Sequence, residues 1–69
     1  MNAQISFTPA IGEIIEVKNT DWSTWTKVLY VREDSYGNWI VCPLYQADRL
    51  AAGQEVIEIP YRFAKPIEA

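Results

Sequence analysis

Side chains that commonly carry catalysis are scarce in this chain of 69 residues. It contains no histidine and a single cysteine, Cys42. A Cys–His dyad, a Ser–His–Asp triad and an ordinary zinc site all need histidine or several cysteines, so none of them can form. Cys42 lies in an apolar run, residues 39–44, which favours a buried thiol over a reactive one. We therefore expect no catalytic residue, no metal site and no cofactor.

Carboxylates and glycines give no catalytic pattern either. Examples of carboxylate pairs are Glu33 with Asp34 and Glu13 with Glu16. Such pairs are typical of solvated turns and strand ends, whereas acid–base chemistry needs a pocket and shifted pKa values. Three scattered glycines do not make a phosphate-binding loop. We conclude that the chain works by binding.

Aromatic side chains are the residues best suited to that role. They make up 13% of the chain, and each ring can bury about 150–250 Å². Trp22 and Trp25 lie on a polar segment between two expected strands, where they could line a ligand groove or where one could plug the core. Three arginines could converge on an anion beside such rings, or could be ordinary surface residues: Arg32, Arg49 and Arg62. The candidate binding residues are Trp22, Trp25, Tyr36, Trp39, Tyr45, Arg32 and Arg62.

The segment of residues 39–45 allows two orientations, because both of its faces are apolar. One register turns Ile40, Cys42 and Leu44 inward and leaves outside Trp39, Val41 and Tyr45. The other register buries Trp39 and Val41. We expect the first, since a free cysteine is usually buried. It would create an outward apolar patch, for which an interface is the usual reason.

The charge balance narrows the class of partner. Nine acidic residues against six basic ones give a net charge of −3, whereas duplex DNA binding relies on concentrated lysine and arginine. Nucleic acid is therefore an unfavourable partner, and a basic protein is a compatible one. The N-terminus lacks the pattern of a signal peptide, and no segment approaches the ~20 apolar residues of a membrane span. With no disulfide within the chain, we expect a cytosolic protein.

The pattern of β-branched and aromatic residues predicts the elements that position these groups. Residues 1–10 form an extended lead-in that Ile5 and Phe7 tie down. Strands are expected over residues 11–19, 25–33, 39–45 and 55–63, with a hairpin turn at residues 34–38 around Gly37.

Proline and glycine refine this pattern. Pro43 and Pro60 should mark strand ends or edge strands, since proline cannot donate to a ladder. Residues 46–53, closed by Gly53, form a long polar loop or a short helical turn near residues 47–52.

Short, closely spaced strands over residues 11–69 predict one small all-β domain. A closed or nearly closed antiparallel barrel of four to five strands would remove its edge strands. We expect an SH3-like barrel. An OB-like barrel is the alternative, and it usually needs a longer chain.

Several short motifs resemble a group of small tailed-phage proteins of unknown function. The matching pieces are Gly12, the aromatic motif at residues 21–27, the hairpin around Gly37 and Asn38, and the ending at residues 61–67. This ending departs from the group's pattern, because two residues separate Phe63 from Pro66 where one is commoner. The resemblance spans residues 11–67. It implies a phage origin and an SH3-like fold, and it brings no activity.

Three binding functions follow from these observations. The leading expectation is a phage accessory protein in the host cytoplasm that binds a host or phage protein through exposed aromatics, blocking a host process such as defence. The second is a protein that sequesters a small nucleotide ligand in a pocket of tryptophan, tyrosine and arginine, where a homo-oligomer is expected. A nucleic-acid-binding module is the third, and the acidic balance argues against it.

Overall fold

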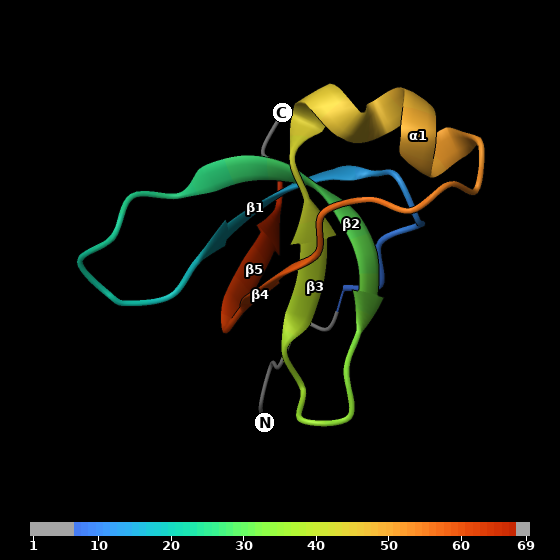
Figure 1. Cartoon of the computed structure of the whole chain (residues 1–69). Coiled ribbons are helices and arrows are strands. Elements are labelled where there is room, and N and C mark those ends of the chain that lie inside the picture. The colour runs from blue at the N-terminus through green and yellow to red at the C-terminus, as the bar shows by residue number, and fades with distance from the viewer. Residues whose placement is uncertain (1–6, 68–69) are drawn as a thin grey trace.

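The computed structural model describes residues 7–67, which form one five-stranded antiparallel sheet in the order β4-β3-β2-β1-β5 (Figure 1). Between β3 and β4, a single 3-10 turn (η1) leads into one short helix (α1). The all-β class, the strand number and the helical turn are thus confirmed. The bounds are β1 Ile14–Lys18, β2 Thr26–Glu33, β3 Trp39–Cys42, η1 Leu44–Gln46, α1 Ala47–Ala51, β4 Ile59–Tyr61 and β5 Phe63–Pro66.

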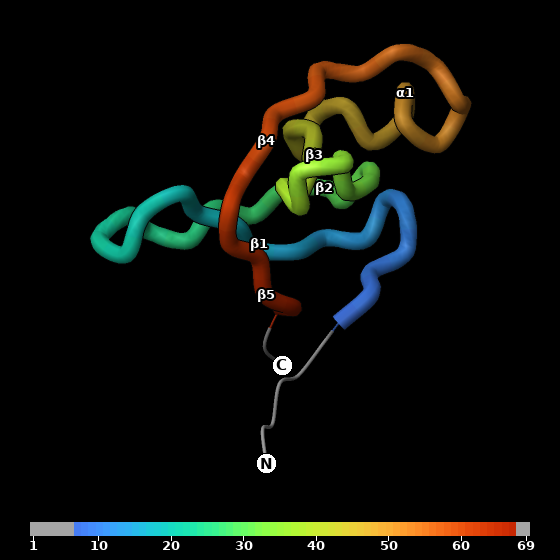
Figure 2. The backbone as a smooth tube through the Cα atoms, turned by 90° about the horizontal axis from the view of Figure 1, so that it is seen from below, coloured from blue at the N-terminus to red at the C-terminus, as the bar shows by residue number. Residues whose placement is uncertain are grey.

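The sheet does not close into the expected barrel within residues 7–67. β4 pairs with β3 and β5 pairs with β1, but no ladder joins β4 to β5, which form the two edges. Only Arg62 separates these strands in the sequence, and Figure 2 shows the chain running from β4 beside β3 to β5 beside β1. β4 is three residues long and contains Pro60, which lacks an N–H group, so it offers few groups for closure.

The strand expected over residues 55–63 is wrong at both ends of that range. Residues 55–58 form no strand, and the chain breaks at Arg62 before β5 begins. Part of the reason is that the backbone of this segment binds the helical region instead. The Ile57 N–H donates to the Gln46 side-chain oxygen at 2.6 Å, and the Arg49 Nε–H donates to the Glu55 carbonyl at 2.9 Å.

The expected turn between β2 and β3 is confirmed at residues 34–38. The Gly37 N–H donates to the Asp34 carbonyl at 3.2 Å, and Gly37 has a φ of 85°, which favours glycine. The Asp34 carboxylate accepts hydrogen bonds from the Asn38 side chain and from the backbone N–H groups of Asn38 and Tyr36. These bonds, those of Asn38 first, lower the pKa of the Asp34 carboxyl.

Pro43 and Pro60 lie at a strand end and in an edge strand, as the sequence predicts. β3 ends at Cys42, directly before Pro43, and Pro60 lies in the edge strand β4.

One face of the sheet carries the core cluster. The cluster consists of four buried residues, Ile15, Val17, Val28 and Val41. Ile15 and Val17 both lie on β1, two positions apart, which confirms the expected alternation along this strand. Phe7 packs on this cluster and stacks on Trp39 with ring centroids 5.3 Å apart, so the expected contact of Phe7 is confirmed. Ile5 lies outside the described residues. The other half-buried residues against the cluster are Tyr30, Trp39, Ile59, Tyr61 and Ala64.

The opposite face is also buried where β2 and β3 meet. Leu29 lies opposite Cys42 in the ladder, and both are buried together with Ile40. β3 is therefore covered on both faces, because Val41 points into the core cluster and its two neighbours point away from it.

This double burial corrects the register expected for residues 39–45. Ile40 and Cys42 are buried as expected, but Trp39 and Val41 pack on the core cluster and form no outward patch. Leu44 and Tyr45 are exposed, since the chain leaves the sheet at Pro43 and enters η1.

Candidate functional site

The loop of residues 19–25 between β1 and β2 projects from the sheet, and we call it the arm (Figure 1). Its turn is braced by a bond from the Ser23 N–H to the Thr20 carbonyl at 3.2 Å and by a short bond between the hydroxyls of the same two residues. The Lys18 ammonium also donates to the Asp21 carbonyl at 3.3 Å. The braced turn holds Trp22 with 86% of its surface exposed.

Trp25, at the base of the arm, lies under two lysines. The ammonium groups of Lys18 and Lys65 lie 4.7 and 4.8 Å from its ring centroid, within the range of cation–π attraction. Lys65 also contacts the Glu16 carboxylate at 3.7 Å. Two ammonium groups thus converge on one half-buried ring beside one carboxylate.

The ladder explains why these side chains meet. Glu16 lies opposite Lys27 on β2 and opposite Lys65 on β5, so the three residues form a row across the sheet. Lys18 lies opposite Phe63 one step along the same face. We define the basic–aromatic patch as Lys18, Trp25, Lys27, Phe63 and Lys65.

We call the arm together with the basic–aromatic patch the arm end. Its net charge is positive, whereas that of the chain is negative. Four of the six basic residues lie in or beside it, against the acidic residues Glu16 and Asp21. The fourth basic residue is Arg62, whose backbone N–H donates to the Asn19 side chain at 3.1 Å. Basic residues that are scattered in the sequence are concentrated by strand pairing.

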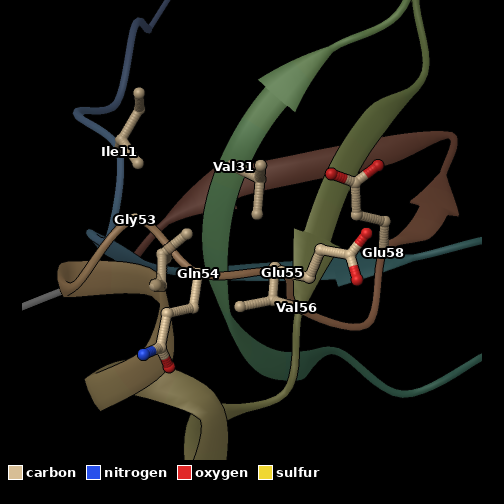
Figure 3. Close-up of a pocket in the computed structure, with 8 residues that line it drawn as sticks. Ile11, Val31, Gly53, Gln54, Glu55, Val56 and Glu58 are labelled. Carbon is tan, nitrogen blue, oxygen red and sulfur yellow. The ribbon is translucent and has the colours of Figure 1, made fainter.

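A concave region lies between α1 and the segment of residues 53–58. We call it the helix-side groove, and it has a volume of about 720 Å³. Figure 3 shows Ile11, Val31 and Val56 around one opening, with the carboxylates of Glu55 and Glu58 beside them. An adjoining hollow of about 540 Å³ shares Ile11 and Leu50 and reaches Leu29 on β2.

The groove combines an apolar lining with an acidic surround. Ile11 is 71% exposed there, so a large aliphatic side chain is accessible at the edge of the groove. Glu55 and Glu58 line the groove and Asp48 lines the adjoining hollow. Two arginines offset part of this charge, because Arg32 pairs with Glu58 at 2.8 Å and Arg49 is tied to the Glu55 carbonyl.

The aromatic residues expected to bind do not form a single site. Trp22 and Trp25 lie at the arm, Tyr36 is 88% exposed in the turn between β2 and β3, and Tyr45 is exposed in η1. Trp39 is half-buried between Phe7 and Tyr30, which places it in the core. The three arginines have different neighbours: Arg32 pairs with the Glu58 carboxylate, Arg49 donates to the Glu55 backbone carbonyl, and the backbone N–H of Arg62 donates to the Asn19 side chain.

Cys42 is fully buried, as its apolar neighbours predict. Burial raises the pKa of its thiol above the ordinary 9.0, and the nearby charge of Glu58 adds to that rise. A protonated, enclosed thiol is a poor nucleophile. The described residues contain no group of three or more acidic or cysteine side chains placed to hold a metal ion.

Sequence reasoning missed the two lysines over Trp25 and the whole helix-side groove. Lys65 is 40 positions from Trp25, so only the pairing of β1 with β5 brings them together. The nearest local signal for the groove is Gly53 beside the alanine pair 51–52, which predicts the helix end and not the hollow beside it.

Within residues 7–67 no helix is long and apolar enough to cross a membrane. No protein-family model, no curated protein and no solved structure matches the chain.

Proposed function

We propose that this chain is a non-enzymatic binding protein of the small tailed-phage kind that its sequence resembles, and that it engages an acidic segment of a host or phage protein through the basic–aromatic patch. Such binding would block a host process such as defence. The observation that carries the proposal is the convergence of Lys18 and Lys65 on the ring of Trp25.

The chemistry of the patch supports an acidic partner. The Lys65 ammonium pairs with the Glu16 carboxylate, whereas the Lys18 ammonium donates to a neutral acceptor, the Asp21 carbonyl, so an incoming carboxylate would find an uncompensated positive charge. Lys18 and Lys65 are half-buried, which reduces their screening by solvent. Trp25 holds both lysines in place, and an ordered donor loses less entropy on binding. The exposed Phe63 adds apolar area at the edge.

The same geometry favours a protein segment over a nucleic acid. Lysines lie over the ring of Trp25, which makes this ring less free to stack on a base. The rest of the described surface is predominantly acidic, which would repel a long phosphate backbone.

We also propose that the sheet is an open form of the SH3-like barrel. The strand order and the one-residue link between the two edge strands support this assignment, since a small further curl of the sheet would bring β4 and β5 together.

The test is the binding of a poly-glutamate peptide to the full chain, measured by calorimetry. The double variant Lys18→Gln/Lys65→Gln should bind about tenfold or more weakly, because it removes both charged donors. A matched control, Ser35→Asp/Ala52→Glu, changes the net charge equally at two exposed sites outside the patch and should bind as the unchanged protein does. Added salt should weaken the binding.

Three results would overturn the proposal. One is no binding of the peptide by the unchanged protein. The second is an equal loss in the control variant, which would make net charge the cause. The third is preferential binding of a single-stranded oligo-dT, which would make the patch a nucleic-acid site. Thermal melts of both variants check that each is folded.

A further inference from the structure

We propose that the helix-side groove receives the Trp22 arm of a second copy of this chain, so that copies associate head to tail. This inference rests on the proposed function in one respect. Both assign an acidic contact surface to the lysines beside the arm, and in the assembly that surface would be the groove. The inference goes beyond that function in assigning Trp22 and the groove to each other.

The first argument is the chemistry of the two parts. Trp22 is almost fully exposed on a turn braced by three hydrogen bonds, and tryptophan is one of the residues enriched at the hot spots of protein interfaces. The groove offers apolar side chains from Ile11, Leu50 and Val56 around an open hollow. Gly53 also lines it without a side chain, which lets a partner ring approach the backbone.

The second argument is charge. The arm end carries four basic and two acidic residues. The groove and the adjoining hollow are lined by three acidic residues, Asp48, Glu55 and Glu58, and two basic residues, Arg32 and Arg49, are bonded to this segment. Docking the arm in the groove therefore brings surfaces of opposite net charge together, which favours this orientation over its alternatives.

The third argument is position. Both views place the arm on one side of the molecule and α1 on the opposite side (Figures 1 and 2). The arm therefore cannot fill the groove of its own chain. A contact between two different patches is heterologous, so each added copy leaves one arm and one groove free, and assembly continues until a ring closes or a filament grows.

Sedimentation of the full chain over a range of concentrations tests the assembly. The unchanged protein should form species larger than a dimer. Trp22→Ser should weaken association about tenfold or more, because it removes the anchor. Its matched control is Tyr36→Ser, which removes an equally exposed aromatic ring from the other turn and should assemble normally.

A groove variant tests the other half of the contact. Gln54→Arg/Glu55→Arg adds positive charge at two exposed positions of the groove and should also prevent assembly. Its control, Glu33→Arg/Ser35→Arg, makes the same change of net charge beside the turn between β2 and β3 and should not.

Mixing the two defective variants gives the decisive result. Trp22→Ser retains its groove and Gln54→Arg/Glu55→Arg retains its arm, so a mixture should form one heterodimer and stop there. A monomeric unchanged protein at every concentration, equal assembly of Trp22→Ser and Tyr36→Ser, or the absence of a heterodimer would each overturn the inference. The poly-glutamate assay is kept separate by running it also on Trp22→Ser, which retains Lys18 and Lys65 but lacks the anchor, so that peptide binding by this variant does not depend on assembly.

Discussion

The two faces of the sheet differ in how completely they are covered. On one face, Ile15, Val17, Val28 and Val41 form a closed cluster beneath aromatic rings. On the other face, the five-residue helix α1 and Leu29 line an open hollow, and two lysine side chains lie over the ring of Trp25. The basic–aromatic patch and the helix-side groove both lie on this second, thinly covered face.

The difference follows from the size of the chain. A domain of 69 residues has too little apolar surface to bury two complete layers. One face then provides most of the stability, and the other is free to carry charge and open hollows. Lysine stems cover apolar surface while their charged ends stay at the solvent, so the patch both covers apolar surface and presents charge.

Substitutions of neighbouring residues on β1 should show the largest difference between the two faces, in the free energy of unfolding. Ile15 is fully buried in the core cluster, whereas its neighbour Ile14 is 46% exposed on the opposite face. Ile15→Ala should reduce the free energy of unfolding by about 2–5 kcal/mol, because it leaves a cavity. Ile14→Ala should reduce it by less than about 1 kcal/mol. Urea unfolding measures both, and equal losses would mean that the two faces are equally packed.

Cys42 reports on the helix cover of the second face. Leu50→Ala should raise the rate at which a thiol reagent labels Cys42 by about tenfold, since it loosens α1 above Leu29 and its ladder partner. Ala52→Gly, at an exposed position after the helix, is the control for helix propensity alone and should have a smaller effect. Unchanged labelling in Leu50→Ala would show that the helix does not protect the thiol.

The pH dependence of stability should follow from the same residue. The folded pKa of the Cys42 thiol is raised above the ordinary 9.0, so the folded chain keeps its proton where the unfolded chain loses it. This contribution to the free energy of unfolding is complete below pH 9.0 and falls as the pH rises through the folded pKa. Cys42→Ala should remove that part of the alkaline decline, and an identical alkaline profile would contradict this assignment.

The smallest effect should distinguish the tryptophans by solvent access. Iodide should quench Trp22 strongly and Trp39 weakly, because Trp22 is exposed beside the carbonyl that binds the Lys18 ammonium, while Trp39 lies between Phe7 and Tyr30. Trp22→Phe should therefore remove most of the quenchable fluorescence, whereas Trp39→Phe should not. Caesium, a cation, should quench less than iodide does, and the reverse order would contradict a basic arm.

Local patterns were sufficient for most elements of this fold. The alternation of apolar residues predicts β1, Gly37 with Asn38 predicts the turn after β2, and Pro43 predicts the end of β3. The failures lie where long-range contacts decide. Residues 55–58 have a strand-like composition, but their backbone bonds with Gln46 and Arg49 hold them against the helical region.

The candidate site was predictable only in part. Trp22 stood out by its type and its polar neighbours, and the structure exposes it. Trp39 has the same type, yet Phe7, 32 positions earlier, covers it. Exposure depends on partners that lie far away in the sequence, and a single chain read locally does not identify them.

The sequence by itself determined that the chain is a small all-β domain without histidine, with one cysteine in an apolar run and with more acidic than basic residues. Those properties depend on composition and on the two-residue repeat of a strand, which are local. Only the tertiary structure decided that the basic residues gather around Trp25, that β4 and β5 remain apart, and that an acidic groove lies beside α1. Each of these depends on strand pairing and on what covers each face, because charge and exposure are properties of neighbours in space.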